Sequence, residues 1–321
     1  MTVPAWTRPG LSWLRRRFLD PEPPLAAVEV RAGSLGVVRV VRDKRASSLG
    51  AAASLELPAG TLKLSMAERN IIEPEAFKQT LRAVLERAGV LGDGRIGLVL
   101  PDPVARVALL PAAEVRARGR AEREELIRFR LKKAVPFDIR EAHLSFREVG
   151  APGQEPTFLV VAILRSILDE YEGACRALGV EPGLVQLTGL AILDAVEESR
   201  PPADRVLVNW DEGYISILVS RFGAPALART LTGVSASDPE QVMREATQTI
   251  LYYRERLGGE GIAHAVVRSA AMLPAEAARL LEQPLGLTPD ILDPWGSLGR
   301  NEQEMAQALA GAAACVIGKA A

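Results

Sequence analysis

The chain has 321 residues, of which 48% are hydrophobic and 25% are charged, with a formal net charge of −1 at pH 7. This composition is ordinary for a globular protein, and the length allows two domains because single cores stop growing near ~250–300 residues. The balanced charge provides no basic face, so we expect no nucleic-acid partner. Two histidines and two distant cysteines, Cys175 and Cys315, cannot supply the ligand spacing of a metal site, and we expect none.

The first 24 residues, 1–24, read as a basic amphipathic tail and a proline-rich linker. Residues 6–19 place Arg15, Arg16 and Arg17 between aromatic and aliphatic side chains, a pattern that can lie in an anionic membrane surface. A tail that packs only in an assembled state explains the same pattern, and we favour it. Because the sequence contains neither a signal-peptide core nor a run of about 20 apolar residues, we expect a cytoplasmic protein.

Strand patterns begin directly after the linker. Alternating aliphatic residues predict three strands and permit a fourth, at residues 25–31, 35–43, 52–57 and 61–66. A helix follows at 73–89, where Phe77 and Leu81 share one face and Gly89 provides the stop. Three strands followed by a helix are the opening of an actin-like subdomain of the ribonuclease-H type.

A small inserted α+β domain is predicted at about 95–164. A charged helix in it has Leu126, Phe129 and Ala134 at spacings that share one face, and it ends where Pro136 removes an amide. The strands of this domain are predicted at residues 96–100, 104–110, 142–149 and 158–164.

The same order of elements recurs in the second half of the chain. Pro201 and Pro202 mark a hinge, and two helices before it are predicted at residues 166–178 and 185–197. Beyond the hinge the pattern predicts three strands, a helix, a strand and two helices, at residues 205–209, 214–220, 226–232, 239–257, 265–268, 274–281 and 301–319. This duplication predicts an α/β (α+β) protein with actin-like domain I at 25–200, domain II at 203–321, and the last helix packing back.

The corner between the charged helix and its strand resembles one protein family. KAVPF at residues 133–137, followed by Leu144 and Phe146, is similar to the helix, Pro-Phe corner and strand of the type IV pilus assembly protein PilM. Further segments resemble pieces of that family in the same order, namely LGVEP at 178–182, QTILYYR at 248–254, and DP at 293–294 before residues 313–318.

The resemblance implies an actin-like protein at the cytoplasmic face of the inner membrane that docks the cytoplasmic N-terminal tail of PilN. For this chain it implies a scaffold for type IV pilus assembly and twitching motility, with a PilN-like tail and other assembly components as partners. Self-association and peripheral membrane association are further options. Candidate walls for a tail groove are Leu98, Leu100, Val135, Pro136 and Phe137, and plain core packing is the alternative for each.

The resemblance also implies a nucleotide cleft built from three loops. Its positions in this chain are Glu29, Arg31, Gly33, Ser34, Asn209, Asp211, Gly213, Arg268 and Ser269. The loops of such clefts use an Asp to organise magnesium and small residues that let backbone amides approach phosphate.

Several of these positions depart from the family pattern. Glu29 replaces the Asp, Arg31 replaces a glycine, and Gly36 replaces a lysine. Bulk at Arg31 and Trp210 would obstruct the approach of backbone to phosphate, and the acidic Asp211 would repel it. We therefore expect no catalytic residue and no cofactor, although the charge of Arg31 and Arg268 leaves ATP with magnesium open.

Two other classes of protein remain as alternatives. An active actin-like ATPase, or a sugar-kinase relative, would use Glu29 or Asp211 as its carboxylate, but it needs the missing glycines. A component of a secretion system like GspL, or a membrane-tethered filament like FtsA, would share the fold. The former normally continues into a membrane span, and the latter carries an amphipathic C-terminal helix, unlike the Ala-rich residues 301–319.

Overall fold

The computed structural model describes residues 23–43, 47–92, 94–150, 155–199, 201, 203–233, 238–296 and 303–317. The predicted tail at residues 6–19 lies outside the described residues, as does Pro202 of the predicted hinge. Among the described helices, none combines the length and apolar character that a membrane span needs.

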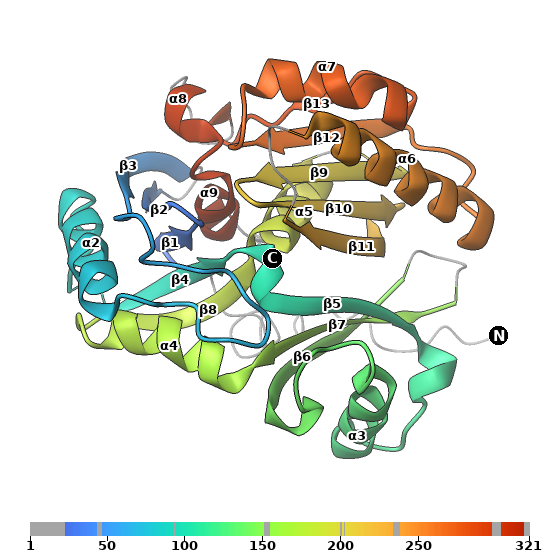
Figure 1. The fold of residues 1–321 in the computed structure, drawn as a ribbon, viewed down its shortest axis with the longest axis horizontal. Helices are drawn as coiled ribbons and strands as arrows, with labels where there is room; N and C mark the ends of the chain where they lie inside the picture. Colours follow the sequence, from blue (N-terminus) through green and yellow to red (C-terminus); the bar gives the residue numbers. More distant parts are fainter. Residues whose placement is uncertain are drawn as a thin grey trace.

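Two five-stranded sheets with the same strand order form the framework (Figure 1). The first, in the order β3-β2-β1-β4-β8, contains β1 (Ala26–Val30), β2 (Ser34–Arg42), β3 (Ser47–Glu56), β4 (Arg95–Leu100) and β8 (Glu181–Leu187). The second, in the order β11-β10-β9-β12-β13, contains β9 (Arg205–Asp211), β10 (Tyr214–Arg221), β11 (Ala224–Thr232), β12 (His264–Ser269) and β13 (Asp290–Ile291). In each sheet three antiparallel strands are extended by two parallel ones, which is the duplication that the sequence predicted.

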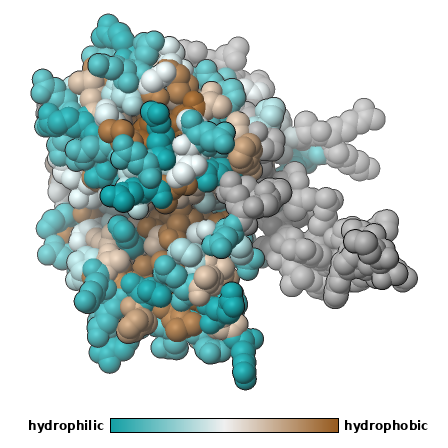
Figure 2. All heavy atoms as spheres, turned by 90° about the vertical axis from the view of Figure 1, so that its right-hand side faces the viewer, coloured by the Kyte–Doolittle hydropathy of each residue, from teal (hydrophilic) through white to brown (hydrophobic). Residues whose placement is uncertain are grey.

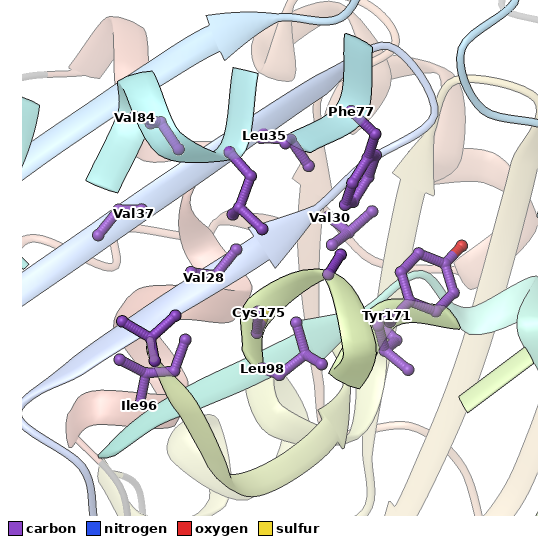
Figure 3. Close-up of a cluster of buried hydrophobic side chains, with 14 of the residues drawn as sticks. Val28, Val30, Leu35, Val37, Phe77, Val84, Ile96, Leu98, Tyr171 and Cys175 are labelled. Carbon is purple, nitrogen blue, oxygen red and sulfur yellow. The ribbon is translucent and has the colours of Figure 1, made fainter. Parts of the chain in front are cut away.

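Amphipathic helices cover one face of each sheet. In α2 (Pro74–Arg87), Phe77, Leu81, Val84 and Leu85 are buried because their spacing places them on one side of the helix. They pack with α4 (Arg165–Arg176) over the first sheet, as Figure 3 shows for Phe77, Val84, Tyr171 and Cys175. The second sheet is covered in the same way by α6 (Pro239–Arg256) and α7 (Pro274–Leu285).

Two helices lie between the sheets. They are α5 (Thr188–Ser199) and α9 (Ala310–Ile317), and α9 is preceded by the short α8 (Gln303–Ala306) (Figure 1). Leu309, Ala312 and Val316 pack on the first sheet, whereas Ala310 and Ala314 pack with α5 and the second sheet. The last helix therefore joins the two halves of the molecule.

The inserted domain is a three-stranded sheet covered by one helix. Its order is β5-β7-β6, from β5 (Ala105–Pro111), β6 (Ala142–Val149) and β7 (Thr157–Leu164), and α3 (Arg120–Leu131) lies on one face. Three short 3₁₀ helices connect these elements, η1 (Asp102–Val104), η2 (Ala112–Val115) and η3 (Ile139–Glu141). β4 belongs to the first sheet between β1 and β8, although we had placed Arg95 at the start of the insertion.

The predicted inner face of α3 was wrong for Phe129 and Ala134, whereas Leu126 is half-buried against the core of the inserted domain. Ile127 and Leu131 are buried, whereas Phe129 is 74% exposed and Ala134 lies beyond the end of the helix in an exposed turn. Ile127 and Leu131 are four residues apart, so they share one side of the helix, and Phe129 lies on the other.

Three other predicted elements differ from the structure. Residues 185–187 are the end of β8, a largely half-buried edge strand that pairs in parallel with β4 and that periodicity did not separate from the helix after it. Residues 61–66 form only an isolated bridge, between Leu62 and Ile71. The predicted last helix is interrupted by a turn at 307–309, so that α8 and α9 are separate.

Glycines allow α9 to approach the first sheet closely. A Cβ at Gly97 in β4 would lie 2.5 Å from Cys315 Sγ and 3.1 Å from the Cβ of Ala27, and one at Gly36 in β2 would collide with Leu309. At Gly311 in α9, a Cβ would lie 2.9 Å from Val99 Cγ1. Cys315 is a free, buried thiol in this contact, and Cys175 is likewise free and buried. The approach therefore requires small residues on both sides.

We expect Gly97→Ala to lower the free energy of unfolding by about 1–3 kcal/mol, because the added methyl group overpacks the contact with α9. Gly173→Ala in α4 is the matched control, since no atom lies within 4 Å of a Cβ there, and it should be neutral or stabilising by up to ~1 kcal/mol. Urea unfolding measures both variants. Equal effects of the two substitutions would contradict the packing argument.

Candidate functional site

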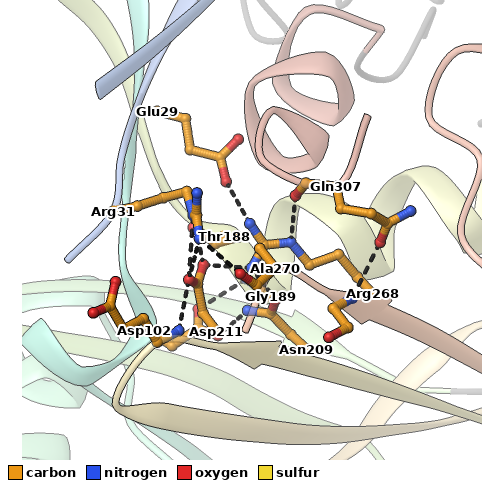
Figure 4. Close-up of polar contacts among 12 residues, drawn as sticks. Glu29, Arg31, Asp102, Thr188, Gly189, Asn209, Asp211, Arg268, Ala270 and Gln307 are labelled. Carbon is orange, nitrogen blue, oxygen red and sulfur yellow. Dashed lines mark hydrogen bonds and ion pairs between the residues drawn. The ribbon is translucent and has the colours of Figure 1, made fainter. Parts of the chain in front are cut away.

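Three chain segments that are distant in sequence meet between the two sheets. They are the turn after β1, the turn after β9, and the end of β12 with the residues that follow it (Figure 4). β1 and β9 occupy the same central position in their sheets, so the turns that follow them are equivalent and face one another. This is where the sequence predicted a degenerate nucleotide cleft.

Four charged side chains form a connected ion-pair network at this meeting point. Arg31 Nη2 lies 2.8 Å from Asp211 Oδ1, and Arg31 Nε donates to Asp211 Oδ2 at 3.1 Å. Arg268 Nη1 donates to the other side of the same carboxylate, and Arg268 Nη2 lies 3.5 Å from Glu29 Oε1. The Arg31 side chain is 14% exposed and the other three are fully buried. We call Glu29, Arg31, Asp211 and Arg268 the interdomain network.

The interdomain network also binds the C-terminal helices. Arg268 Nε donates to the carbonyl oxygen of Gln307 at 2.7 Å, and the Gln307 side chain accepts from Ser269 N and donates to Leu292 O. Glu29 Oε2 accepts from Ala312 N at 2.8 Å, an amide in the first turn of α9 that has no partner within the helix. One carboxylate of the first sheet thus contacts both Arg268 and the last helix.

Burial and ion pairing shift the pKa values of the two carboxyl groups in opposite directions. Burial by itself would raise the pKa of Asp211, but Arg268 and Arg31 hold it below its ordinary value. Glu29 is paired less closely, so burial raises its pKa from 4.5 to about 7, against the opposing effect of Arg268. The carboxylates raise the pKa of Arg268, although burial acts to lower it. Asp211 is therefore ionised at neutral pH, whereas Glu29 gains or loses its proton near neutral pH.

A second polar cluster lies directly behind the interdomain network. Asn209 Oδ1 accepts from Arg268 Nη1 at 3.0 Å, and Asn209 Nδ2 donates to Asp102 Oδ2 at 2.9 Å. Asp102 Oδ1 accepts from Gly189 N at 2.8 Å, and a Cβ at Gly189 would meet that carboxylate. Burial raises the pKa of Asp102. The cluster connects η1 and β9 to the start of α5.

Several donors of the two turns are already used within the protein. Arg31 N donates to Ser34 O, Glu212 N donates to Asp211 Oδ1, and Arg31 Nη1 donates to Ser34 Oγ. A Cβ at Gly33 would lie 3.0 Å from Glu212 Oε2, so the tips of the two turns are close together. A triphosphate there would meet the carboxylates of Asp211 and Glu212, and both guanidinium groups are neutralised. This donor set does not suit a phosphate chain.

A cavity of about 660 Å³ lies beside the interdomain network. Its lining consists of Arg31, residues 269–275, residues 291–293 and residues 306–308. Ser269 Oγ donates to Met272 O within the lining, and the side chain of Leu273 is 73% exposed. The polar groups are thus mostly satisfied, and the free lining is largely apolar.

All nine predicted cleft positions lie at this site. Glu29, Arg31, Asp211 and Arg268 form the network, Asn209, Ser34 and Ser269 make hydrogen bonds beside it, and Gly33 and Gly213 lie in the turns. Gly213 has φ 77°, a backbone conformation that glycine adopts without strain. Sequence reasoning missed Asp102 and Gln307. The position of Asp102, directly after a buried strand and Pro101, was the available signal.

The predicted walls of a tail groove are not brought together. Leu98 and Leu100 were wrong as groove walls, because β4 lies in the middle of the first sheet and both side chains are buried in its core. Val135 and Phe137 are half-buried against the core of the inserted domain, and Pro136 is exposed.

An apolar surface lies instead on the face of the inserted sheet that is turned away from α3. Val107, Leu109 and Val161 are half-buried there, and Val107 and Val161 pack in part against the core of the first domain. The alternate positions, Ala108, Leu110 and Val160, pack under α3. Leu190 of α5 and Ala228 of β11 border it, because β11 lies against β5. Figure 2 shows apolar atoms at this waist between the upper and lower parts of the molecule. We call Val107, Leu109, Val161, Leu190 and Ala228 the apolar waist.

Comparison with solved structures identifies the fold. The chain resembles a Bacteroides thetaiotaomicron protein described as having an actin-like ATPase fold and unknown function, with a TM-score of 0.53 and 9% identity over 91% of this chain and 97% of that one. The fold, with its duplicated sheets and convergent turns, is therefore actin-like, as the sequence predicted. It matches more strongly a chain of the PilM-PilN type IV pilus biogenesis complex, with a TM-score of 0.74 and 19% identity over 92% of this chain and 97% of that one.

At these identities the likeness establishes the fold alone. The cytoplasmic domain of EpsL, an inner-membrane component of the type II secretion system of Vibrio cholerae, is more distant, with a TM-score of 0.44 and 10% identity over 77% of this chain and 83% of that one. No protein-family model and no curated protein matches the sequence.

The interdomain network generates a prediction for the pH dependence of stability. The pKa of Glu29 is raised from 4.5 to about 7 in the folded protein. Glu29 therefore ionises more readily in the unfolded chain, and this difference lowers the free energy of unfolding as the pH rises. The decrease is absent below about pH 4.5, grows by up to ~1.4 kcal/mol per pH unit towards pH 7, and is constant above it. We therefore expect Glu29→Gln to reduce the loss of stability between pH 5 and pH 7.

Urea unfolding at a series of pH values measures this difference. The side-chain amide oxygen of the Glu29→Gln variant would still accept the hydrogen bond from Ala312, so the substitution changes the titration more than the packing. Glu86→Gln, at an exposed position of α2, is the control and should parallel the wild type. Parallel curves for Glu29→Gln and the wild type would show that Glu29 does not titrate in this range.

Proposed function

We propose that this protein is a scaffold of a type IV pilus assembly complex and that it works without binding or hydrolysing ATP. The likeness to a chain of the PilM-PilN type IV pilus biogenesis complex over nearly the full length of both chains supports the assembly role. The interdomain network supports the proposal that ATP does not bind. Its two guanidinium groups and two carboxylates lie where the phosphates of a nucleotide would be expected.

Two physical reasons support the absence of a bound nucleotide. First, Arg31 and Arg268 are already paired with Asp211 and Glu29, so a phosphate would have to replace buried ion pairs. Second, Glu212 approaches Gly33 across the gap and would repel the phosphate charge. The same network joins the two domains directly. We propose that no residue here is catalytic.

The partner that we propose is the cytoplasmic tail of a PilN-like membrane protein, bound in an extended conformation at the apolar waist. Val107 and Leu109 alternate along β5 at the spacing that offers pockets to alternate side chains of a peptide. β5 and β11 are edge strands, so each has backbone groups that no strand of the described residues pairs. Such a tail would hold the protein at the cytoplasmic face of the inner membrane, with other assembly components and further copies as additional partners.

Titration calorimetry with magnesium-ATP tests the nucleotide part of the proposal. We expect no saturable binding with a dissociation constant near or below about 1 mM, equivalent to about −4 kcal/mol. Binding of the tail peptide by the same sample shows that the protein is folded and active. Saturable binding of ATP near about 1 μM would instead favour an actin-like ATPase.

Fluorescence anisotropy with a labelled PilN-like tail peptide tests the docking part. We expect Leu109→Ser to weaken binding by about tenfold or more, because one buried apolar contact contributes about 1.5–3 kcal/mol. Leu273→Ser removes a leucine that is 73% exposed on the other domain, and it should leave the affinity unchanged. Equal affinities of the two variants and the wild type would place the tail elsewhere.

A further inference from the structure

The outer side of α3 and the turn after it carry an exposed aromatic residue among cations. Phe129 has the highest exposure, 74%, among the exposed large hydrophobic side chains of the described residues. Lys132 and Lys133 are three and four residues further on, both exposed, and neither forms an ion pair within 4 Å in the described part of the chain. Arg130 is also exposed, and its nearest carboxylate is Glu114 at 3.6 Å. We call Phe129, Arg130, Lys132 and Lys133 the α3 surface.

The charge close to Phe129 is mostly positive, since Lys132 and Lys133 follow it, while one exposed acidic residue, Glu125, lies a turn before it on the same side of α3. Residues 126–137, LIRFRLKKAVPF, contain four basic residues and no acidic one. The next acidic residue, Asp138, is paired with Arg140. The end of α6 offers a comparison within the same chain, since Leu251 and Tyr252 are exposed there too, but basic and acidic residues alternate in RERLGGE after them. Of these two segments, the one around Phe129 alone combines an exposed ring with two adjacent lysines that form no ion pair within the described residues.

The α3 surface is held in a fixed orientation. Ile127 and Leu131 anchor the helix to the core of the inserted domain. Arg128 Nη1 donates to the carbonyl oxygen of Ile139 at 2.6 Å and of Ala142 at 3.3 Å, while its Nη2 donates to Glu124 Oε1 at 2.7 Å. The ring of Phe129 and the two lysines are therefore presented outwards by a helix end that is tied to η3 and β6. A preorganised surface loses less entropy when it binds.

We propose that the α3 surface docks the protein onto an anionic phospholipid bilayer. Figure 1 places α3 at the lower end of the molecule, on the far side of the inserted domain from the second sheet, and Figure 2 shows apolar atoms among hydrophilic ones at that end. An exposed ring can enter the boundary between headgroups and acyl chains while lysines contact anionic headgroups.

Three cations and one ring give weak binding by themselves. This inference rests on the proposed function in one respect, namely that a membrane-bound partner raises the local concentration of the protein near the bilayer. The contact would then orient the inserted domain towards the membrane. Because vesicle binding needs no partner, a failure of this inference would leave the proposed tail docking untouched.

Co-sedimentation of the full chain with vesicles tests the proposal, using phosphatidylcholine vesicles with and without phosphatidylglycerol at low salt. We expect binding only to the anionic vesicles, a loss of about 25-fold in the partition coefficient for K132Q/K133Q, at about fivefold per cation, and roughly tenfold for F129S. R254Q/R256Q removes the same charge from the exposed end of α6 and should change the coefficient less than twofold, which is within measurement error. Circular dichroism confirms that each variant is folded.

Four results would overturn the proposal. They are no binding to anionic vesicles, equal binding to neutral vesicles, equal losses for K132Q/K133Q and R254Q/R256Q, and unchanged binding when the α3 substitutions are combined. The last result would assign lipid binding to residues 6–19 instead. A further control measures the binding of soluble polyglutamate. If polyglutamate binds as tightly as the vesicles, and F129S does not weaken that binding, the partner is an acidic protein surface.

Discussion

The relative placement of the two domains depends on four buried charges. Asp211 lies between Arg31, which comes from the other domain, and Arg268, which comes from its own. Removing ions from water is costly, and pairing with good geometry and additional hydrogen bonds offsets that cost. Deleting Asp211 would leave the buried Arg268 without its closest carboxylate, and an uncompensated buried charge typically costs about 3–5 kcal/mol. The network therefore tolerates only arrangements of the domains in which all four groups meet.

The C-terminal helices further restrict the relative placement of the two domains. Glu29 accepts from the first turn of α9, and Arg268 donates to Gln307, so the network is connected to the helix that lies between the sheets. α9 consists mainly of alanine, and the glycines at 36 and 97 remove the side chains that would keep it away from the first sheet. Small residues allow close packing here, and close packing brings backbone amides within reach of a buried carboxylate. Packing and electrostatics thus specify the same position of the helix.

This arrangement separates the interior of the molecule from the surfaces that we propose to be functional. Paired charges join the two domains, and a cavity of about 660 Å³ lies beside them. The α3 surface and three residues of the apolar waist, Val107, Leu109 and Val161, lie on opposite sides of the small sheet of the inserted domain. A partner tail at one face and a bilayer at the other could act on this domain together while the rest of the protein stays rigid.

The sequence by itself determined the duplicated actin-like fold, most helices and strands, and the three turns that meet at the candidate site. It could do so because apolar periodicity, prolines and glycines act over a few residues. Only the tertiary structure decided that Arg31 pairs with Asp211, 180 residues away, and that Arg268 contacts Glu29, 239 residues away. It also decided that Leu98 lies in the core and that Phe129 faces outwards, because burial depends on which elements cover a residue. Local pattern specifies the elements, whereas pairing and burial arise from contacts between residues distant in the chain.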